Sequence, residues 1–181
     1  MGDLKQIRIC GFGGQGVVLA GTILGYAAIN DGKWVSGSNH YGAQARGGSA
    51  RSEVVISKDP ITYPHVIKAD ILIPMSQTAY DDFIKDIAEH GSIVIYDNML
   101  VTPINIEEIT QIGISATNRA ITDLNNKQVA NIVMLCASMA ITKIVSKQAI
   151  ISSIKNNVEA RFMELNLKAV EVGYNLGEAL R

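Results

Sequence analysis

A glycine-rich turn lies near the start of this chain, between a short apolar run and a long apolar segment. The turn covers residues 11–16 and reads GFGGQG. The apolar run at residues 7–10 predicts a buried strand, and the segment from residue 16 onward predicts a helix. In this order of strand, turn and helix, backbone N–H groups at the start of the helix can face a phosphate. The turn therefore favours an α/β fold with an anion-binding site beside its first strand.

A second glycine-rich turn follows some thirty residues later. Residues 41–51 read YGAQARGGSAR, so that Arg46 and Arg51 lie on either side of the pair Gly47 and Gly48. Guanidinium groups bind phosphates and carboxylates with two parallel hydrogen bonds. Together the two turns indicate either a pocket for a phosphorylated ligand or a closely fitted contact with another protein chain.

The length and composition predict one domain over residues 1–181. A chain of about 150 residues already buries roughly 70% of its unfolded surface, so 181 residues can form a sizeable core. Of the residues, 48% are hydrophobic and only 18% are charged, against about a quarter charged in typical soluble domains. This balance indicates an extensive core or a wide contact with another subunit.

Charge and hydropathy exclude two classes of partner. Sixteen basic and seventeen acidic residues give a net charge of −1, and no dense basic stripe is present, so nucleic-acid binding is not expected. The longest apolar stretches, residues 16–29 and 129–141, are shorter than the roughly 20 residues of a membrane span. No basic segment with a small-residue cleavage site marks secretion. We expect no membrane association and a cytoplasmic location.

The two cysteines, Cys10 and Cys136, are far apart in the sequence and neither belongs to a Cys-x-x-Cys motif. An iron–sulfur cluster normally needs four thiolates, and a structural zinc site needs four ligands. Buried cysteines usually behave as small hydrophobic residues. We therefore expect both thiols in the core, and no metal centre made by this chain.

Strand and helix signals alternate along the chain. Gly32 and Gly91 stand just past predicted helices, as expected of helix C-termini, and Ser76 is a typical N-cap residue. The pattern predicts an α/β, Rossmann-like fold, with a mainly parallel sheet flanked by helices and a helical C-terminal third. The first two strands and the helix between them should form a right-handed βαβ unit. Strands are predicted at residues 6–10, 33–36, 49–57, 70–74, 92–96 and 113–116, and helices at 16–31, 77–89, 129–145, 147–156 and 159–180.

A nicotinamide or flavin dinucleotide site is one alternative for the first turn. Such sites carry an Asp or Glu about 20 residues further on, which binds the ribose hydroxyls. Here the corresponding segment, residues 34–40, reads WVSGSNH and has no carboxylate. The three histidines, His40, His65 and His90, have no metal-ligand spacing, and no serine lies in a nucleophile elbow. We expect no acid–base catalysis by this chain.

Several motifs in register resemble one family. They are GFGGQGVVLAG at residues 11–21, YGAQARGGSARSEVVIS at 41–57, ITYP at 61–64 and ADILIPMSQ at 69–77. This combination resembles the gamma subunit, or gamma domain, of the 2-oxoacid:ferredoxin oxidoreductases, and is most similar to the version in 2-oxoglutarate:ferredoxin oxidoreductase. The resemblance covers residues 7–97; the C-terminal helices agree in length and order more than in motif.

The resemblance implies a subunit of a multisubunit oxidoreductase. Such an enzyme decarboxylates a 2-oxoacid, forms the acyl-coenzyme A and reduces ferredoxin. It implies thiamine diphosphate, magnesium and iron–sulfur clusters on companion subunits: alpha, beta and, in some complexes, a ferredoxin-like delta subunit. The gamma part is associated with coenzyme A, whose phosphates are anions that glycine-turn amides and arginines bind.

Carried over to this chain, the resemblance implies a set of cofactor-binding residues. The amides of the first turn would bind a phosphate, an arginine of the second turn would supply charge, and the Tyr41 ring would contact the adenine or the pantetheine arm. Ser76 and Gln77 follow a strand at the edge where ligands bind in open α/β sheets. The residues are Gly11, Gly13, Gly14, Gln15, Gly16, Tyr41, Arg46, Gly47, Gly48, Arg51, Ser76 and Gln77.

Other interpretations stay open at this point. The second turn could serve only to dock another subunit, with Arg46 and Arg51 forming ion pairs across the contact. The chain could also be a purely structural assembly subunit, or a stand-alone nucleotide-binding dehydrogenase. Within the family, the oxoacid could be pyruvate, a branched-chain oxoacid or indolepyruvate in place of 2-oxoglutarate.

Overall fold

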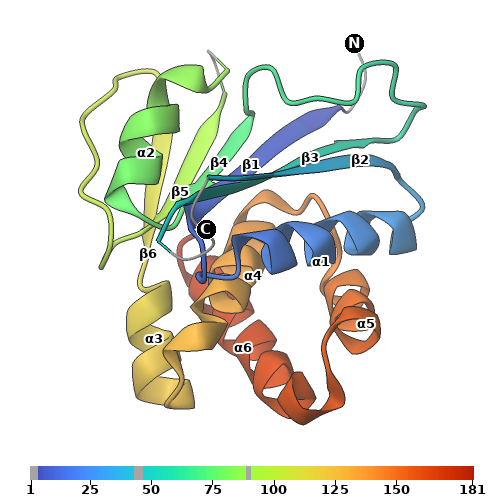
Figure 1. The fold of residues 1–181 in the computed structure, drawn as a ribbon, viewed down its shortest axis with the longest axis vertical. Coiled ribbons are helices and arrows are strands. Elements are labelled where there is room, and N and C mark those ends of the chain that lie inside the picture. The colour runs from blue at the N-terminus through green and yellow to red at the C-terminus, as the bar shows by residue number, and fades with distance from the viewer. Residues whose placement is uncertain (1–3, 43–46, 89–90) are drawn as a thin grey trace.

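The computed structural model describes residues 4–42, 47–88 and 91–181. These residues form one mixed sheet with helices on both faces (Figure 1). The strand order in the sheet is β2-β3-β1-β4-β5-β6. The elements in chain order are β1 (Lys5–Phe12), α1 (Val17–Asn30), β2 (Trp34–Tyr41), β3 (Ser49–Ser57), β4 (Ile71–Pro74), α2 (Gln77–Phe83), η1 (Ile84–Asp86), β5 (Ile93–Asp97), β6 (Thr110–Ile114), α3 (Ala116–Leu124), η2 (Lys127–Val129), α4 (Ala130–Thr142), α5 (Lys147–Asn157) and α6 (Ala160–Ala179).

The sheet is mainly parallel, as predicted. β1 pairs in parallel with β4, β4 with β5 and β5 with β6, whereas β3 is antiparallel to both of its neighbours, β1 and β2. β2 therefore runs parallel to β1, as expected for the predicted βαβ unit. The two strands are not adjacent, however, because the reversed strand β3 is inserted between them.

The helices are divided unequally between the two faces of the sheet (Figure 1). α1 and α4 pack on one face, with α5 and α6 outside them, and α2 packs on the opposite face. β3 alternates accordingly: Val54 and Ile56 belong to the core on the α1 face, whereas Val55 points to the other face. The side covered by α1 is the α1 face of the sheet, and the side covered by α2 is its α2 face.

α4 lies at the centre of the helical layer. Its residues are apolar nearly all round and are buried from Ala130 to Ala140, as the sequence predicts. α6 packs against it through Gly173 and Gly177, where an added Cβ would overlap the α4 backbone. The helical C-terminal third is thus confirmed, and α4 is buried by this chain's own elements.

Three predicted elements differ from the structure, and one observed helix was not predicted. The strand predicted at residues 113–116 lies at Thr110–Ile114 (β6), because it pairs there with β5. The helix predicted at residues 77–89 ends at Phe83 and continues as a 3-10 turn to Asp86, because the chain then pairs with Ala69: the Ala88 N–H donates to the Ala69 carbonyl. The strand predicted at residues 33–36 extends to Tyr41, because β3 pairs with its whole length. α3 was not predicted. His90 lies outside the described residues.

Candidate functional site

The first glycine turn connects β1 to α1 at the carboxyl ends of the parallel strands. Gly14 and Gly16 have φ angles of 99° and 74°, in the left-handed region that favours glycine. A Cβ added to Gly14 would meet no atom within 4 Å, so the turn is open at this residue. A Cβ added to Gly16 would overlap the Asn131 side chain. The turn is thus open on one side and supported by α4 on the other.

Gln15 holds the turn in shape. Its Oε1 accepts from the Phe12 N–H at 2.7 Å, and its Nε2 donates to the Met75 carbonyl at 2.7 Å. Its own N–H donates to the Phe12 carbonyl at 3.1 Å. The side chain of Gln15 therefore joins the turn to the end of β4. The backbone N–H of Gln15 is already paired within the chain.

The two glycine turns, far apart in the sequence, lie against each other. The Gly13 N–H donates to the Gly48 carbonyl at 2.8 Å, and the Gly47 N–H donates to the Gly13 carbonyl at 3.3 Å. The structure thus brings together the two turns that the sequence singled out. Arg46, the first of the two predicted arginines, lies outside the described residues.

Tyr41 and Arg51 lie on opposite faces of the sheet. Directly paired residues of antiparallel strands share a face. Tyr41 pairs with Ala50, which belongs to the core on the α1 face, whereas Arg51 pairs with Cys10, which packs with α2. The structure therefore does not place these two predicted ligand contacts side by side.

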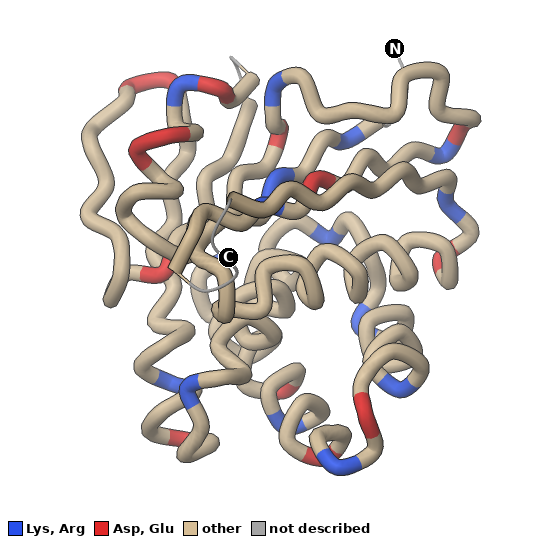
Figure 2. Tube along the Cα trace, viewed as in Figure 1, with Lys and Arg blue, Asp and Glu red and all other residues tan. Residues whose placement is uncertain are grey.

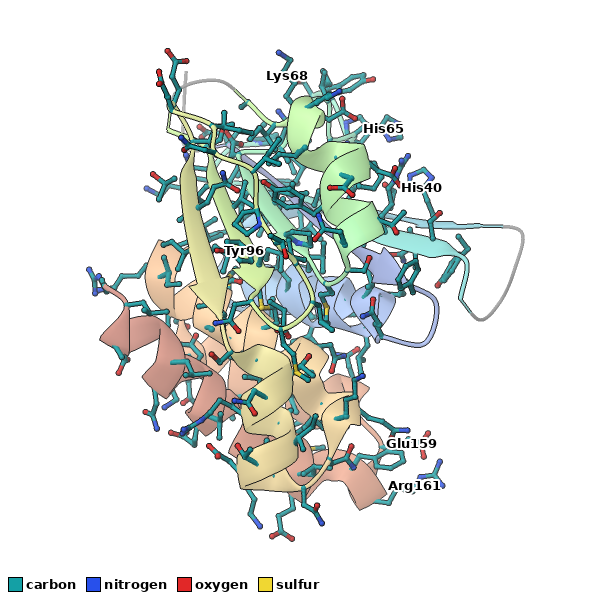
Figure 3. The ribbon with its side chains drawn as sticks, turned by 90° about the vertical axis from the view of Figure 1, so that its left-hand side faces the viewer. His40, His65, Lys68, Tyr96, Glu159 and Arg161 are labelled. Atoms are coloured by element: carbon teal, nitrogen blue, oxygen red, sulfur yellow. The ribbon has the colours of Figure 1, made fainter. Side chains whose placement is uncertain are left out.

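Arg51 belongs to a buried charge cluster on the α2 face. The Glu53 carboxylate, 5% exposed, accepts from Arg8 Nε at 2.8 Å, and Arg51 Nε lies 3.6 Å from the same oxygen. His40 Nε2 lies 3.6 Å from its second oxygen. Both guanidinium groups lie over the Phe83 ring, at 4.8 and 5.4 Å from its centroid. Figure 3 shows His40 on the side of α2.

Ser76 and Gln77 occupy the carboxyl end of β4, as predicted. Ser76 Oγ accepts from the Ala79 N–H at 3.2 Å and is the N-cap of α2. The Gln77 side chain accepts from the Thr102 N–H at 2.7 Å and donates to Asp81 at 2.8 Å. Because α1 and α2 leave toward opposite faces from β1 and β4, this edge is the crevice where open α/β sheets bind ligands.

The start of α1 has the properties of an anion-binding terminus. No side chain caps it, and its first turn has no acidic residue. α1 has no charged residue from Val17 to Asn30, and Figure 2 draws it entirely in tan. Within the described residues, the N–H groups of Gly14 and Gly16 have no hydrogen-bond partner. Unpaired N–H groups and the helix dipole together stabilise a bound anion.

One polar residue beside this terminus was missed by the sequence analysis. Asn131 is 3% exposed, and its Nδ2 donates to the Gly16 carbonyl at 3.0 Å. A single asparagine near the start of an otherwise apolar, buried helix was the available signal, because buried amides need a partner.

Comparison with known proteins identifies the family. Residues 6–176 match the model of the family described as "Pyruvate ferredoxin/flavodoxin oxidoreductase". This chain belongs to that family. The membership confirms the resemblance that the glycine-turn motifs indicated.

Relatives of this family resemble the chain over nearly its full length. A "2-oxoglutarate synthase subunit KorC" of Methanocaldococcus jannaschii is 45% identical, over 97% of this chain and 95% of that protein. The solved keto/oxoacid ferredoxin oxidoreductase gamma subunit from Geobacter sulfurreducens PCA is 37% identical, with a TM-score of 0.84 over 97% of this chain and 99% of that one. A 2-oxoglutarate:ferredoxin oxidoreductase from Magnetococcus marinus, solved with 2-oxoglutarate, coenzyme A and succinyl-CoA bound, shares the fold at 21% identity, with a TM-score of 0.88 over 98% of this chain and 32% of that one.

Both thiols of this family member are buried and unsuited to reaction. Cys10 and Cys136 are 0% exposed, and burial raises the pKa of each thiol well above its usual range. Among the described residues, no group of three or more His, Cys, Asp or Glu side chains could hold a metal ion. None of the helices in the described part of the chain has the length and apolar character of a membrane span.

Proposed function

We propose that this chain is the gamma-type subunit of a 2-oxoglutarate:ferredoxin oxidoreductase, and that its first glycine turn binds a phosphate of coenzyme A. The complex would convert 2-oxoglutarate, coenzyme A and oxidised ferredoxin to succinyl-CoA, carbon dioxide and reduced ferredoxin. The observation that carries this proposal is the 45% identity, over nearly the whole of both chains, with a 2-oxoglutarate synthase subunit.

The residues at the first turn fit a phosphate of coenzyme A. The N–H groups of Gly14 and Gly16 and the first turn of α1 supply donors, and no acidic side chain lies in that first turn to repel the anion. Gln15 fixes the position of the turn against β4. In this proposal the chain binds and orients coenzyme A, and Gly13 and Gln15 act through the turn's shape because their N–H groups are already paired.

The second turn has a different role in this proposal. Gly47 and Gly48 support the first turn through Gly13. Arg51, whose side chain is 34% exposed on the α2 face, would pair with an acidic group of a companion subunit. Arg46, which lies outside the described residues, stays a candidate to supply charge to the ligand. Thiamine diphosphate, which makes the oxoacid reactive toward decarboxylation, would be held with magnesium and the iron–sulfur clusters by alpha, beta and delta-type companions.

A pair of matched glycine variants tests the phosphate site. Gly14 and Gly32 both have positive φ angles, 99° and 73°, and a Cβ at either would meet nothing within 4 Å. Gly14→Ala and Gly32→Ala should therefore cost similar stability, about 1–2 kcal/mol of backbone strain. Only Gly14→Ala places a methyl group where the phosphate would bind.

We expect Gly14→Ala to raise the KM for coenzyme A about tenfold in the anaerobically copurified complex, because a hydrogen bond to a charged group is worth about 1.5–3 kcal/mol. Gly32→Ala should leave this KM unchanged, and both variants should keep oxoacid decarboxylation. Equal KM values for the two variants, with normal turnover, would contradict the phosphate site. If the second turn serves only docking, variants there should lose companion subunits without any change in the KM for coenzyme A.

The substrate is tested separately with a panel of oxoacids. The copurified complex should reduce ferredoxin with a higher kcat/KM for 2-oxoglutarate than for pyruvate, branched-chain oxoacids or indolepyruvate. A preference for another oxoacid would keep the family and change the substrate. Titration of the full chain with NAD should show no binding; tight NAD binding without companion subunits would favour a dehydrogenase.

A further inference from the structure

A cavity of about 630 Å³ lies at the edge of the sheet opposite to the first glycine turn. Its walls come from the residues that follow α1, the end of α4, the start of α5 and the end of α6. α1 has 14 residues and spans about 21 Å at 1.5 Å per residue, so the cavity and the glycine turn lie at opposite ends of this helix. Cavities of about 300–1,000 Å³ are typical of sites for small molecules.

Cationic side chains outnumber acidic ones around this cavity. Its charged lining residues are Lys33, Lys143, Lys147, Arg181, Asp31 and Glu178. The Asp31 carboxylate is already bonded, because it accepts from the Ser146 N–H at 2.6 Å and from Ser146 Oγ at 2.7 Å. Lys147 pairs with Glu171 at 2.7 Å. The cavity therefore presents an excess of positive charge to a ligand.

Lys33 and Lys143 carry much of this excess. The Lys33 ammonium donates to the carbonyl of Ile144, which is a neutral partner. The Lys143 side chain forms no hydrogen bond or ion pair within the described part of the chain. Both lysines also line a neighbouring cavity of about 310 Å³, together with Lys5 and Lys58, and none of the described residues that line it is acidic. A cavity edged by lysines in this way attracts anions.

A buried tyrosine supplies an unpaired donor in the wall of the larger cavity. Tyr174 is 6% exposed and lines the cavity, and its hydroxyl has no hydrogen-bond partner among the described residues. Burial raises the pKa of Tyr174, so the hydroxyl stays protonated and acts as a donor. Buried polar groups without a partner are rare and costly, so an acceptor bound in the cavity would stabilise this hydroxyl.

We propose that this cavity binds a small organic anion, whose phosphate or carboxylate group is stabilised by Lys33 and Lys143 and accepts from the Tyr174 hydroxyl. The apolar part of the ligand would pack against Met139 and Ile144, which also line the cavity. The volume is that of an organic molecule and not of inorganic phosphate alone. The site is separate from the coenzyme A site of the proposed function and does not depend on it.

The first experiment titrates the full chain by calorimetry with phenyl phosphate, phenylacetate, inorganic phosphate and phenol. The first two carry both an anionic group and an apolar ring, whereas inorganic phosphate lacks the ring and phenol lacks the charge. We expect at least one of the two aromatic anions to bind at least about fivefold more tightly than either fragment. The tighter of the two shows whether the cavity selects a phosphate ester or a carboxylate. If neither aromatic anion binds, or if a fragment binds as tightly, the inference is overturned.

The second experiment locates the bound anion with single variants. Tyr174→Phe should weaken the aromatic anion at least about fivefold, because it removes a hydrogen bond to a charged group. It should not lower the urea midpoint of the free chain, because the hydroxyl has no partner to lose. Lys143→Asn should weaken the anion at least about threefold, and asparagine tolerates the φ angle of 54° at this residue. Lys155→Asn is the matched control, since Lys155 is an exposed residue of α5 that does not line the cavity, and it should change no affinity.

The outcomes separate this cavity from the coenzyme A site. Unchanged affinity in both Tyr174→Phe and Lys143→Asn would place the anion elsewhere and overturn the inference. Saturating coenzyme A should leave the affinity for the aromatic anion unchanged. Competition by coenzyme A would move the anion to the first glycine turn, which would refute the cavity and support the proposed function. Absence of anion binding, with a normal KM for coenzyme A in the complex, would refute the cavity alone.

Discussion

The buried carboxylate of Glu53 gives the sharpest test of how this sheet is stabilised. Glu53 is 5% exposed and faces Arg8, also 5% exposed, through a 2.8 Å hydrogen bond in the middle of the sheet. Arg51 and His40 lie 3.6 Å from its two oxygens. Among the described residues, the other carboxylate within 4 Å of Arg8 is that of Asp86, at 3.8 Å, and its side chain is 59% exposed. Replacing Glu53 therefore leaves the Arg8 charge buried with only a weak, solvated partner.

We expect Glu53→Leu to lower the free energy of unfolding by about 3–5 kcal/mol, the usual cost of breaking a buried ion pair from one side. That is a large part of the roughly 5–15 kcal/mol that stabilises a typical domain. Arg8→Met/Glu53→Leu removes both charges and should cost less than Glu53→Leu alone, because the desolvation penalty disappears with the pair. Arg51 remains, but its side chain is 34% exposed and can turn to solvent.

Urea denaturation followed by far-UV circular dichroism measures these free energies. The exposed pair Lys168 and Glu164 has a similar distance, 2.7 Å, and provides the control: Glu164→Gln should cause no measurable change, because solvent screens exposed pairs. If Glu53→Leu costs less than about 1 kcal/mol, or if the losses in the double variant add, the reasoning from burial is refuted.

Two further predictions concern the turn and the thiols. Gly16→Ala should lower the free energy of unfolding by about 2–4 kcal/mol in urea denaturation, more than Gly14→Ala. Both variants strain a left-handed backbone, but only the Cβ at residue 16 also overlaps the Asn131 side chain of α4. Equal losses for the two variants would contradict this packing. Cys10 and Cys136 should not react with a thiol reagent in the native chain. Both thiols have a raised pKa in the native chain, whereas unfolded thiols lose their proton above about pH 8.5. Below that pH both states are protonated and the thiols do not change the free energy of unfolding. Above it, the free energy of unfolding should fall by up to about 1.4 kcal/mol per pH unit for each thiol. Urea titrations should show this slope, and Cys10→Ala should reduce it; a pH-independent stability would be the contrary result.

The elements that follow from local patterns were predicted well. The strand at residues 49–57, the stop at Gly32 and the Ser76 cap agree with β3, the end of α1 and the start of α2. The places of β2 and the end of α2 depend on pairing with distant strands, which no local window contains. α3 is amphipathic, but it has only nine residues, and its buried residues, Ala116, Thr117 and Ala120, are small or polar, so the sequence does not mark it as a core helix.

The candidate site was predictable in position more than in role. Gln15, Ser76 and Gln77 lie at the predicted edge, yet their side chains bond to the chain's own backbone or to a neighbouring side chain. A polar residue beside a turn can bind a ligand or hold the turn, and the sequence does not distinguish the two. Whether those residues also contact coenzyme A stays a prediction. A contact between Arg51 and coenzyme A also stays a prediction. The register of β1 with β3 decides on which face of the sheet the Arg51 side chain lies.

The register of β1 with β3 has a functional consequence. At the carboxyl edge of β1, the α1 face presents backbone donors and an uncharged cavity, whereas the α2 face presents the charge cluster of Arg51, Glu53 and His40. A phosphate suits the first surface, and an ion-paired contact with another subunit suits the second. Because the sheet separates the two, Arg51→Ala should reduce copurification of companion subunits without changing the KM for coenzyme A of the complex that still assembles. A raised KM for coenzyme A in this variant would show that one ligand spans both faces, and would return Arg51 to the coenzyme A site.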